Sequence, residues 1–187
     1  MQIDKKTGLL LAVPFHSSPH HDARPSPKID LIVIHGISLP PGEFGEDYID
    51  QFFLGKLNFK LHPYFQTIAH LKVSPHILIQ RSGDIVQYVP FKKRAWHAGV
   101  SVFKGRPQCN DFSIGIELEG TDDVPYEKHQ YHQLARLVKI LQKHYKIARD
   151  HIVGHNAIAP GRKTDPGPAF IWDHFFKLLE LQDESIK

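Results

Sequence analysis

Several short segments of the chain carry the apolar patterns that β-strands show. Residues 31–36, LIVIHG, form an apolar run ended by a glycine, which is typical of a strand buried on both faces. Residues 112–120, FSIGIELEG, alternate, so one side of the strand carries Ile114, Ile116 and Leu118 and the other carries Ser113, Gly115, Glu117 and Glu119. The segment HILIQRSGDIVQYVP (76–90) predicts two strands joined at RSGD, and HIVGH (151–155) predicts one more.

Longer periodicities predict helices between and after these strands. Residues 127–145 repeat apolar side chains at helical spacing, which indicates an amphipathic helix packed on the sheet through Tyr131, Leu134, Leu137, Val138, Leu141 and Tyr145. Residues 170–182, FIWDHFFKLLELQ, predict a second helix that buries Trp172, Phe175, Phe176 and Leu179. Residues 46–55, EDYIDQFFLG, predict a short helix closed by Gly55. Strands interleaved with helices predict an α/β fold, in which a central mixed sheet is flanked by helices.

Chain length limits the number of domains. With 187 residues and 41% hydrophobic side chains, the chain can bury one sizeable core, so we expect a single domain over residues 1–187. Residues 14–30, PFHSSPHHDARPSPKID, contain four prolines and predict an arm that crosses the surface. Residues 1–30 would then lead into the first core strand.

Charge and cysteine content exclude several classes of partner. The net charge of +3 is spread along the chain without a basic block, so nucleic acid is not an expected partner, whereas a small acidic ligand is compatible. Cys109 is the sole cysteine, which rules out an intrachain disulfide. GLLLAV (8–13) is shorter than the apolar part of a signal peptide, and no segment approaches a membrane span. We expect a cytosolic protein with no membrane contact and no obligate protein partner, whose histidines, including His20, His21, His129, His132 and His144, are mostly solvated.

Three separate positions predict a metal site. His35 ends one strand, His155 follows another, and Asp165 lies in a loop whose shape is set locally by prolines and glycines, in GHNAIAPGRKTDPGPAF (154–170). We expect no regular helix or strand in this loop. Two imidazoles and a carboxylate match a catalytic zinc site with an open position, where the pKa of water falls to roughly 7. Each position alone is a weak signal, and the alternative is a surface loop with ordinary polar residues.

Two further residues fit the remaining needs of a hydrolase. Glu117 shares its strand face with Ser113 and Gly115, which are small and leave room for water and ligand, so it is a candidate general base. Lys163, on the loop that carries Asp165, could stabilise an oxyanion. The alternatives are that Glu117 and Glu119 form a solvated strand face and that Lys163 is an ordinary surface lysine.

Four stretches of the sequence resemble the zinc amidase type 2 and peptidoglycan-recognition-protein family: VIHGISLPPGEFG, VQYVPFKKRAWHAGVS, CNDFSIGIELEGTD and GHNAIAPGRKTDPGPAF. The resemblance extends from about Pro14 to Trp172. It implies that His35, His155 and Asp165 bind one zinc ion per chain. It also implies that Glu117 is the catalytic base, that Lys163 stabilises the oxyanion, and that Trp96 and His97 lie in the substrate cleft.

The resemblance further implies a reaction. The third ligand is cysteine in many relatives, and an aspartate is typical of the branch that cleaves the amide between 1,6-anhydro-N-acetylmuramic acid and L-alanine during cytosolic peptidoglycan recycling. In bacteria this cleavage also lowers the muropeptides that signal β-lactamase induction. The chain departs from that branch at Gly36, Lys72 and Gln108, which concerns substrate contacts, and Arg106 and Lys72 are our candidates for the stem-peptide carboxylates. Alternatives are a lytic amidase acting on intact peptidoglycan and a non-catalytic recognition module.

Overall fold

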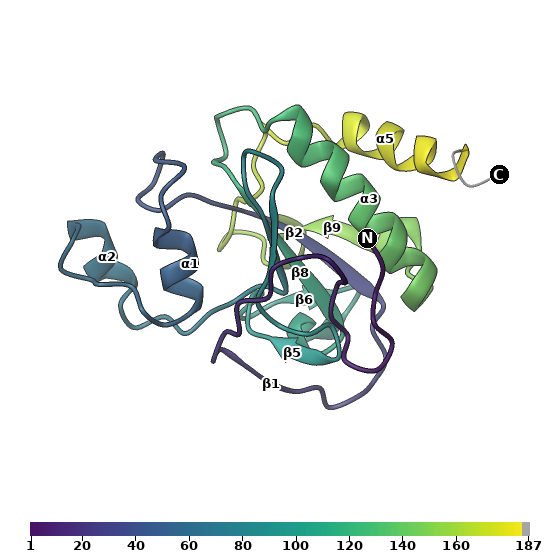
Figure 1. Ribbon diagram of the computed structural model, residues 1–187, viewed down its shortest axis with the longest axis horizontal. Helices are drawn as coiled ribbons and strands as arrows, with labels where there is room; N and C mark the ends of the chain where they lie inside the picture. Colours follow the sequence, from purple (N-terminus) through teal and green to yellow (C-terminus); the bar gives the residue numbers. More distant parts are fainter. Residues whose placement is uncertain (185–187) are drawn as a thin grey trace.

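A five-stranded sheet forms the centre of the computed structural model, which describes residues 1–184 (Figure 1). The strand order is β4-β3-β8-β2-β9, for β4 (Ile85–Gln87), β3 (Ile77–Ile79), β8 (Ser113–Glu119), β2 (Leu31–Ile37) and β9 (Ile152–Gly154). Strands β3, β8, β2 and β9 pair in parallel, and β4 pairs with β3 antiparallel. The described residues therefore form one α/β domain with a mixed sheet, as the sequence predicts.

Two long helices cover one face of this sheet. They are α3 (Lys128–Tyr145) and α5 (Trp172–Glu184), which lie side by side in Figure 1. A capping box between Glu127 and Gln130 fixes the start of α3. The predicted inward side of β8 is confirmed, because Ile114, Ile116 and Leu118 are fully buried in the core that also contains the apolar stripe of α3.

The opposite face of the sheet is covered by shorter elements. The helices α1 (Tyr48–Phe53) and α2 (Pro63–Ile68) pack on Leu78, Val86 and Tyr88. The helix α1 is the one predicted before Gly55. The helix α2, which also has six residues, was not predicted, because no glycine marks its end as Gly55 does for α1. His62 caps it by accepting a hydrogen bond from the amide of Tyr64.

Several small elements complete the chain. These are β1 (His21–Ala23), β5 (Lys93–Ala95), β6 (Val102–Phe103), β7 (Arg106–Pro107), α4 (His155–Ile158) and two short 3-10 turns, η1 (Cys109–Asp111) and η2 (Arg149–His151). The prediction that residues 154–170 contain no regular helix is wrong for α4. This single helical turn ends before the glycines and prolines on which the prediction was based.

The segment 14–30 is more than a surface arm, so that prediction is corrected. Strand β1 pairs with β5, and His20 is 9% exposed, with its ring against Trp96, rather than solvated. Arg24 points into the protein and donates hydrogen bonds to four backbone carbonyls, those of Phe91, Asn110, Asp111 and Ser113. Burial lowers the pKa of Arg24 to about 10, so the guanidinium remains charged at neutral pH. The arm is thus fastened to the segment that precedes β8.

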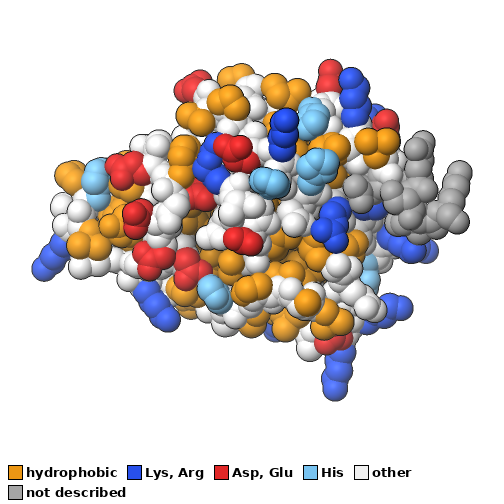
Figure 2. All heavy atoms as spheres, turned by 45° about the horizontal axis from the view of Figure 1, so that its top comes forward, with side chains coloured by type: hydrophobic (Ala, Val, Ile, Leu, Met, Phe, Trp, Pro, Cys, Tyr) orange, Lys and Arg blue, Asp and Glu red, His pale blue; other side chains and the backbone are white. Residues whose placement is uncertain are grey.

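One face of the described part of the protein carries charges of both signs. On the face drawn in Figure 2, basic, acidic and histidine side chains are interspersed. Cys109 is fully buried as a free thiol. Among the described residues, every helix is too short or too polar to cross a membrane.

Replacing Arg24 with methionine should lower the free energy of unfolding by about 2 kcal/mol or more, because the carbonyls that it serves lose a charged donor while the apolar stem is kept. Urea unfolding followed by circular dichroism measures this loss. Arg136→Met, at an exposed position of α3, is the matched control and should change stability by no more than about 0.5 kcal/mol. Equal losses in the two variants would contradict a fastening role for Arg24.

Candidate metal centre and active site

Strand register brings three polar residues to one edge of the sheet. His35 of β2 lies opposite Glu117 of the parallel strand β8. On the other side of β2, Ile34 lies opposite Gly154, the last residue of β9, so His155 follows beside His35. Because the carboxyl ends of parallel strands meet at one edge, these side chains share a site.

Asp165 reaches the same place from the loop after α4. Its carbonyl accepts a hydrogen bond from the amide of Asn156, at 3.0 Å, which ties the loop back to the helical turn. Beyond it, Gly167 has φ +74°, and a Cβ there would lie 2.3 Å from the backbone of Asp122, so a larger residue is excluded. The Tyr126 hydroxyl donates to the carbonyl of Pro166. The position of Asp165 is therefore set by the backbone on both sides.

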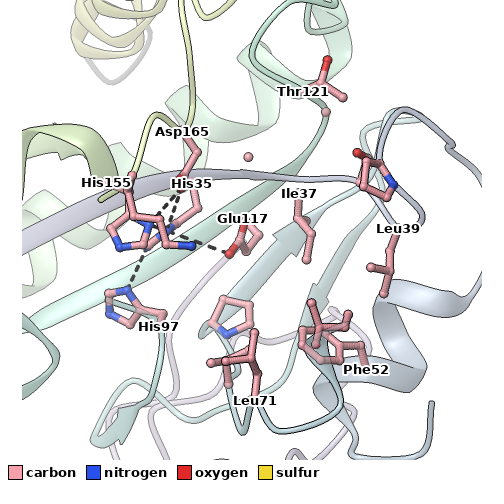
Figure 3. Close-up of a pocket in the computed structure, with 18 of the residues that line it drawn as sticks. His35, Ile37, Leu39, Phe52, Leu71, His97, Glu117, Thr121, His155 and Asp165 are labelled. Carbon is pink, nitrogen blue, oxygen red and sulfur yellow. Dashed lines mark hydrogen bonds and ion pairs between the residues drawn. The ribbon is translucent and has the colours of Figure 1, made fainter. Parts of the chain in front are cut away.

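The side chains of His35, His155 and Asp165 converge on one point (Figure 3). The two Nδ1 atoms are 3.0 Å apart, and the Asp165 Oδ2 atom lies 3.2 Å from Nδ1 of His35 and 3.0 Å from Nδ1 of His155. Two ligands at the zinc–nitrogen distance of 2.0–2.1 Å in a tetrahedron are separated by about 3.3 Å. The observed spacing fits such an ion with little movement.

The proton on His155 supports the same fit. Its Nε2 atom lies 3.0 Å from the carbonyl oxygen of Ala98, which can only accept, so a single ring proton belongs on Nε2 and leaves a bare lone pair on Nδ1. That lone pair faces a carboxylate oxygen and a second ring nitrogen, an arrangement suited to a shared cation. Burial lowers the pKa of His35 to about 4, which keeps this ring neutral and able to act as a ligand at neutral pH.

Glu117 is buried rather than part of a solvated strand face. Its side chain is 12% exposed, its Oε1 atom lies 3.9 Å from Nδ1 of His35, and its Oε2 atom has no hydrogen-bond partner. Burial, with a contribution from the neighbouring Asp165, raises the pKa of this carboxyl well above its usual range, and Lys163 opposes the shift. Glu119 is also buried and accepts hydrogen bonds from the amides of Gly45 and Arg81. The two glutamates therefore differ. Glu119 fixes the backbone at Gly45 and Arg81, whereas the Oε2 atom of Glu117 is free to accept a hydrogen bond or a proton.

The space that Ser113 and Gly115 leave on this strand face is filled by protein. The ring of His97 lies against Gly115, where a Cβ would come within 2.4 Å of it. The Ser113 hydroxyl is hydrogen-bonded to Nε2 of His97 at 2.9 Å. The expectation that this space holds water and ligand is therefore wrong, and Gly115 is needed for the packing of His97.

A cleft of about 590 Å³ opens in front of the cluster. Its polar end includes Lys163, Arg162 and Thr164 from the loop and Thr121 and Asp122 from the segment after β8. Its other end is an apolar wall that sequence reasoning missed, formed by Leu39, Pro41, Phe52, Phe53, Tyr64, Ile68, Leu71 and Val73. The helices α1 and α2 supply half of these residues, and their pattern in the sequence does not distinguish a cleft wall from core.

The predicted substrate-binding residues lie in different places. His97 lines the cleft. Trp96 faces the other way and stacks on His20, and Arg106 pairs with Asp30 at 3.0 Å and lies over the ring of Phe112. Lys72 is exposed between two cleft-lining residues. The structure thus brings His97 to the cluster, leaves Lys72 exposed in a segment whose neighbours Leu71 and Val73 line the cleft, and does not bring Trp96 or Arg106 there.

Two of the positions at which the sequence departs from the resembled branch, Gly36 and Gln108, lie in different surroundings. Gly36 lines the cleft, and a Cβ there would lie 2.3 Å from the hydroxyl of Tyr126, so any larger residue needs a different tyrosine position. Gln108 is exposed with a left-handed backbone at φ 59° and is not among the lining residues.

The mixed sheet thus carries, at the carboxyl ends of its strands, a His–His–Asp cluster that could hold a metal ion, beside a largely buried glutamate. The chain belongs to the N-acetylmuramoyl-L-alanine amidase family, whose sequence profile matches residues 25–168. It is 58% identical over 169 residues to the 1,6-anhydro-N-acetylmuramyl-L-alanine amidase AmpD of Salmonella typhimurium, covering 90% of each chain.

Solved structures agree with this assignment. A crystal structure of an AmpD selenomethionine derivative superimposes with a TM-score of 0.92 at 54% identity, covering 96% of this chain and 99% of that one. The amidase AmiD of Escherichia coli, solved with anhydro-N-acetylmuramic acid-L-Ala-D-γ-Glu-L-Lys, superimposes with a TM-score of 0.60 at 32% identity, covering 84% of this chain and 60% of that one.

The metal-free Glu117→Gln variant should be more stable than the metal-free wild type at neutral pH. Because burial raises the pKa of the Glu117 carboxyl, the folding stability of the wild type falls as pH rises above the ordinary value of 4.5, and glutamine, which cannot ionise, avoids this loss. The difference should disappear at lower pH, where the carboxyl is protonated in both states.

Urea unfolding of both proteins across this pH range measures the effect. The exposed Glu43→Gln is the matched control and should show no such pH-dependent gain. A Glu117→Gln variant no more stable than the wild type at neutral pH would show that folding does not raise the pKa of Glu117.

Proposed function

We propose that the protein hydrolyses the amide between 1,6-anhydro-N-acetylmuramic acid and the L-alanine of the stem peptide, in the recycling of peptidoglycan. One observation carries the proposal: identity of 58% to AmpD over 90% of both chains, in a chain whose fold assembles His35, His155, Asp165 and Glu117 at one site. The cytosolic location predicted from the sequence is part of this proposal.

A metal ion would be held by Nδ1 of His35, Nδ1 of His155 and a carboxylate oxygen of Asp165. A zinc ion there would polarise the scissile carbonyl and lower the pKa of water. The buried Glu117 takes one proton from the attacking water and gives it to the leaving alanine nitrogen as the C–N bond breaks. Its unpartnered Oε2 and raised pKa suit both transfers, because a carboxylate with a raised pKa accepts a proton more readily than an ordinary one.

Lys163 lines the cleft at the same end as the cluster. An ammonium there stabilises the negative charge that develops on the carbonyl oxygen during attack. The proximity of Lys163 also opposes the rise in the pKa of Glu117, so the two side chains are electrostatically coupled. This combination supports the roles that the resemblance implies for both residues.

The shape of the cleft supports a ligand with a polar and an apolar part. The polar end can hold the amide and the peptide, and the apolar wall from α1 and α2 can hold the less polar face of the anhydro sugar. Lys72, exposed between two cleft-lining residues, remains our candidate for a peptide carboxylate. Arg106 and Trp96 are not substrate contacts in this proposal, because Arg106 pairs with Asp30 and Trp96 stacks on His20.

The alternatives are less well supported. A non-catalytic recognition module needs neither convergent metal-type ligands nor a buried glutamate without a partner. A lytic amidase uses the same bond chemistry on a polymer, so it differs from the proposal in substrate rather than in mechanism.

The purified protein should contain one zinc ion per chain, and a chelator should abolish activity that added zinc restores. Glu117→Gln should keep the zinc and lower kcat by about 10²–10⁴, because it removes the general base and leaves the ligands in place. Elemental analysis and peptide release measure the two quantities. Active protein without metal would contradict the metal site, and a rate unchanged in Glu117→Gln would contradict its role as base.

Peptide release from anhydro-N-acetylmuramyl-peptides should be much faster than from intact sacculi, as measured by mass spectrometry of the products. Lys72→Gln should raise KM more than it lowers kcat, because the contact is made in the ground state as well as in the transition state. Lys177→Gln, on the exposed side of α5, is the matched control. Equal or faster turnover of sacculi would favour the lytic amidase.

A further inference from the structure

One dipeptide contacts both histidines of the metal cluster from behind. The ring of His97 meets Nε2 of His35 through its Nδ1 atom, at 2.9 Å. The next residue, Ala98, presents its carbonyl oxygen to Nε2 of His155, at 3.0 Å. Figure 3 shows the first of these contacts on the side of His35 away from Asp165. Adjacent residues therefore supply one partner to each histidine.

Both partners can accept an N–H. The carbonyl of Ala98 is an obligate acceptor, so it fixes the proton of His155 on Nε2. Ser113 can accept the Nε2–H of His97, which leaves Nδ1 of His97 free to accept the Nε2–H of His35. In this arrangement both metal-facing Nδ1 atoms carry bare lone pairs. An imidazole oriented in this way is ready for a metal without a change of tautomer.

Asn110 holds the dipeptide in place from outside the cleft. Its side-chain oxygen accepts hydrogen bonds from the amide of His97, at 3.1 Å, and from the amide of Ala98, at 2.8 Å. Asn110 is itself fixed, because its own carbonyl accepts from the buried Arg24. Neither Asn110 nor Arg24 lines the cleft. Asn110 can therefore affect the two histidines of the cluster through the position of His97 and Ala98.

Arg162 holds the second half of the dipeptide from the opposite side. It donates to the carbonyl of Ala98, at 2.6 Å, and to that of Val100, at 2.7 Å. Gly115 supplies the remaining condition, because only a residue without a side chain leaves room for the ring of His97. The dipeptide is therefore fixed at its amides, at its carbonyl and at its one large side chain.

We propose that Asn110 is a positioning residue for metal binding: it holds His97 and the Ala98 carbonyl so that they orient His35 and His155 with Nδ1 toward the metal. The inference rests on the metal site of the proposed function. It assigns a role to a residue that touches neither metal nor substrate. Partners of this kind are worth about 10- to 100-fold in metal affinity.

The test compares two substitutions at Asn110. Asn110→Ala removes the acceptor for both amides and should weaken zinc binding by about 10- to 100-fold in a chelator competition. Asn110→Asp keeps an oxygen acceptor at the same place and should retain most of the affinity. Proton NMR of the zinc-loaded, ¹⁵N-labelled proteins should show the hydrogen-bonded Nε2–H signals of His35 and His155 in the wild type and in Asn110→Asp, and should lose or broaden them in Asn110→Ala.

Two controls separate this role from general destabilisation. Asn58→Ala removes another loop asparagine whose side chain accepts a backbone amide, and should leave zinc affinity unchanged. His97→Leu removes the acceptor for His35 and should weaken zinc binding, whereas His151→Leu removes a histidine that bonds the carbonyl of Asp30, away from the site, and should not. Thermal unfolding shows which variants fold. If His97→Leu does not fold, the zinc affinity and the N–H signals of Asn110→Ala alone decide whether Asn110 has the positioning role.

Zinc affinity and N–H signals unchanged in folded Asn110→Ala would overturn the positioning role while leaving the metal site intact. A wild-type protein that binds no zinc would overturn the metal site and the positioning role together.

Discussion

The parallel pairing of β2 with β8 on one side and with β9 on the other places His35, Glu117 and His155 at the site. Because His35 lies opposite Glu117 and beside the residue that follows Gly154, a shift of one residue in either pairing would turn a ligand or the glutamate to the other face of the sheet. The apolar residues of these strands hold the register, since Ile32, Ile34, Ile114 and Ile116 are all fully buried in the same core. The core beneath the site and the chemistry above it therefore depend on one alignment.

That alignment gathers three metal-type ligands and a second carboxyl in one place. Two bare ring nitrogens face a carboxylate, and a second carboxyl is buried nearby without a partner. Such an arrangement persists because the surrounding backbone determines it, through Gly167 against Asp122 and through the loop bonds that hold Asp165. The stability of the surrounding fold therefore holds the site residues in an arrangement that they would not adopt by themselves.

Much of this could be predicted from the sequence, and the missing parts share a physical cause. The alternation in β8 and the apolar run in β2 are local patterns and were predicted correctly, whereas α2, with no glycine at its end, and α4, with only one turn, lack such a local pattern. His35, His155 and Asp165 could be selected as zinc-type ligands, and the structure brings them together, but their roles came from the resemblance. The contacts of Arg106 with Asp30 and of His97 with Gly115 join different segments of the chain, so no local pattern reveals them. Arg106 was therefore expected to bind substrate, and the space beside Glu117 that His97 fills was expected to be open.

The aspartate in the proposed ligand set has a consequence for chemical durability. Where a family member uses a cysteine thiolate as ligand, peroxide can convert it to a sulfenic or higher acid that no longer binds metal. Neither imidazole nor carboxylate enters that series of oxidations. The lone cysteine of this chain, Cys109, is fully buried, and its single methionine is Met1. The ligand set of this protein is thus insensitive to the oxidative damage to which a thiolate site is exposed.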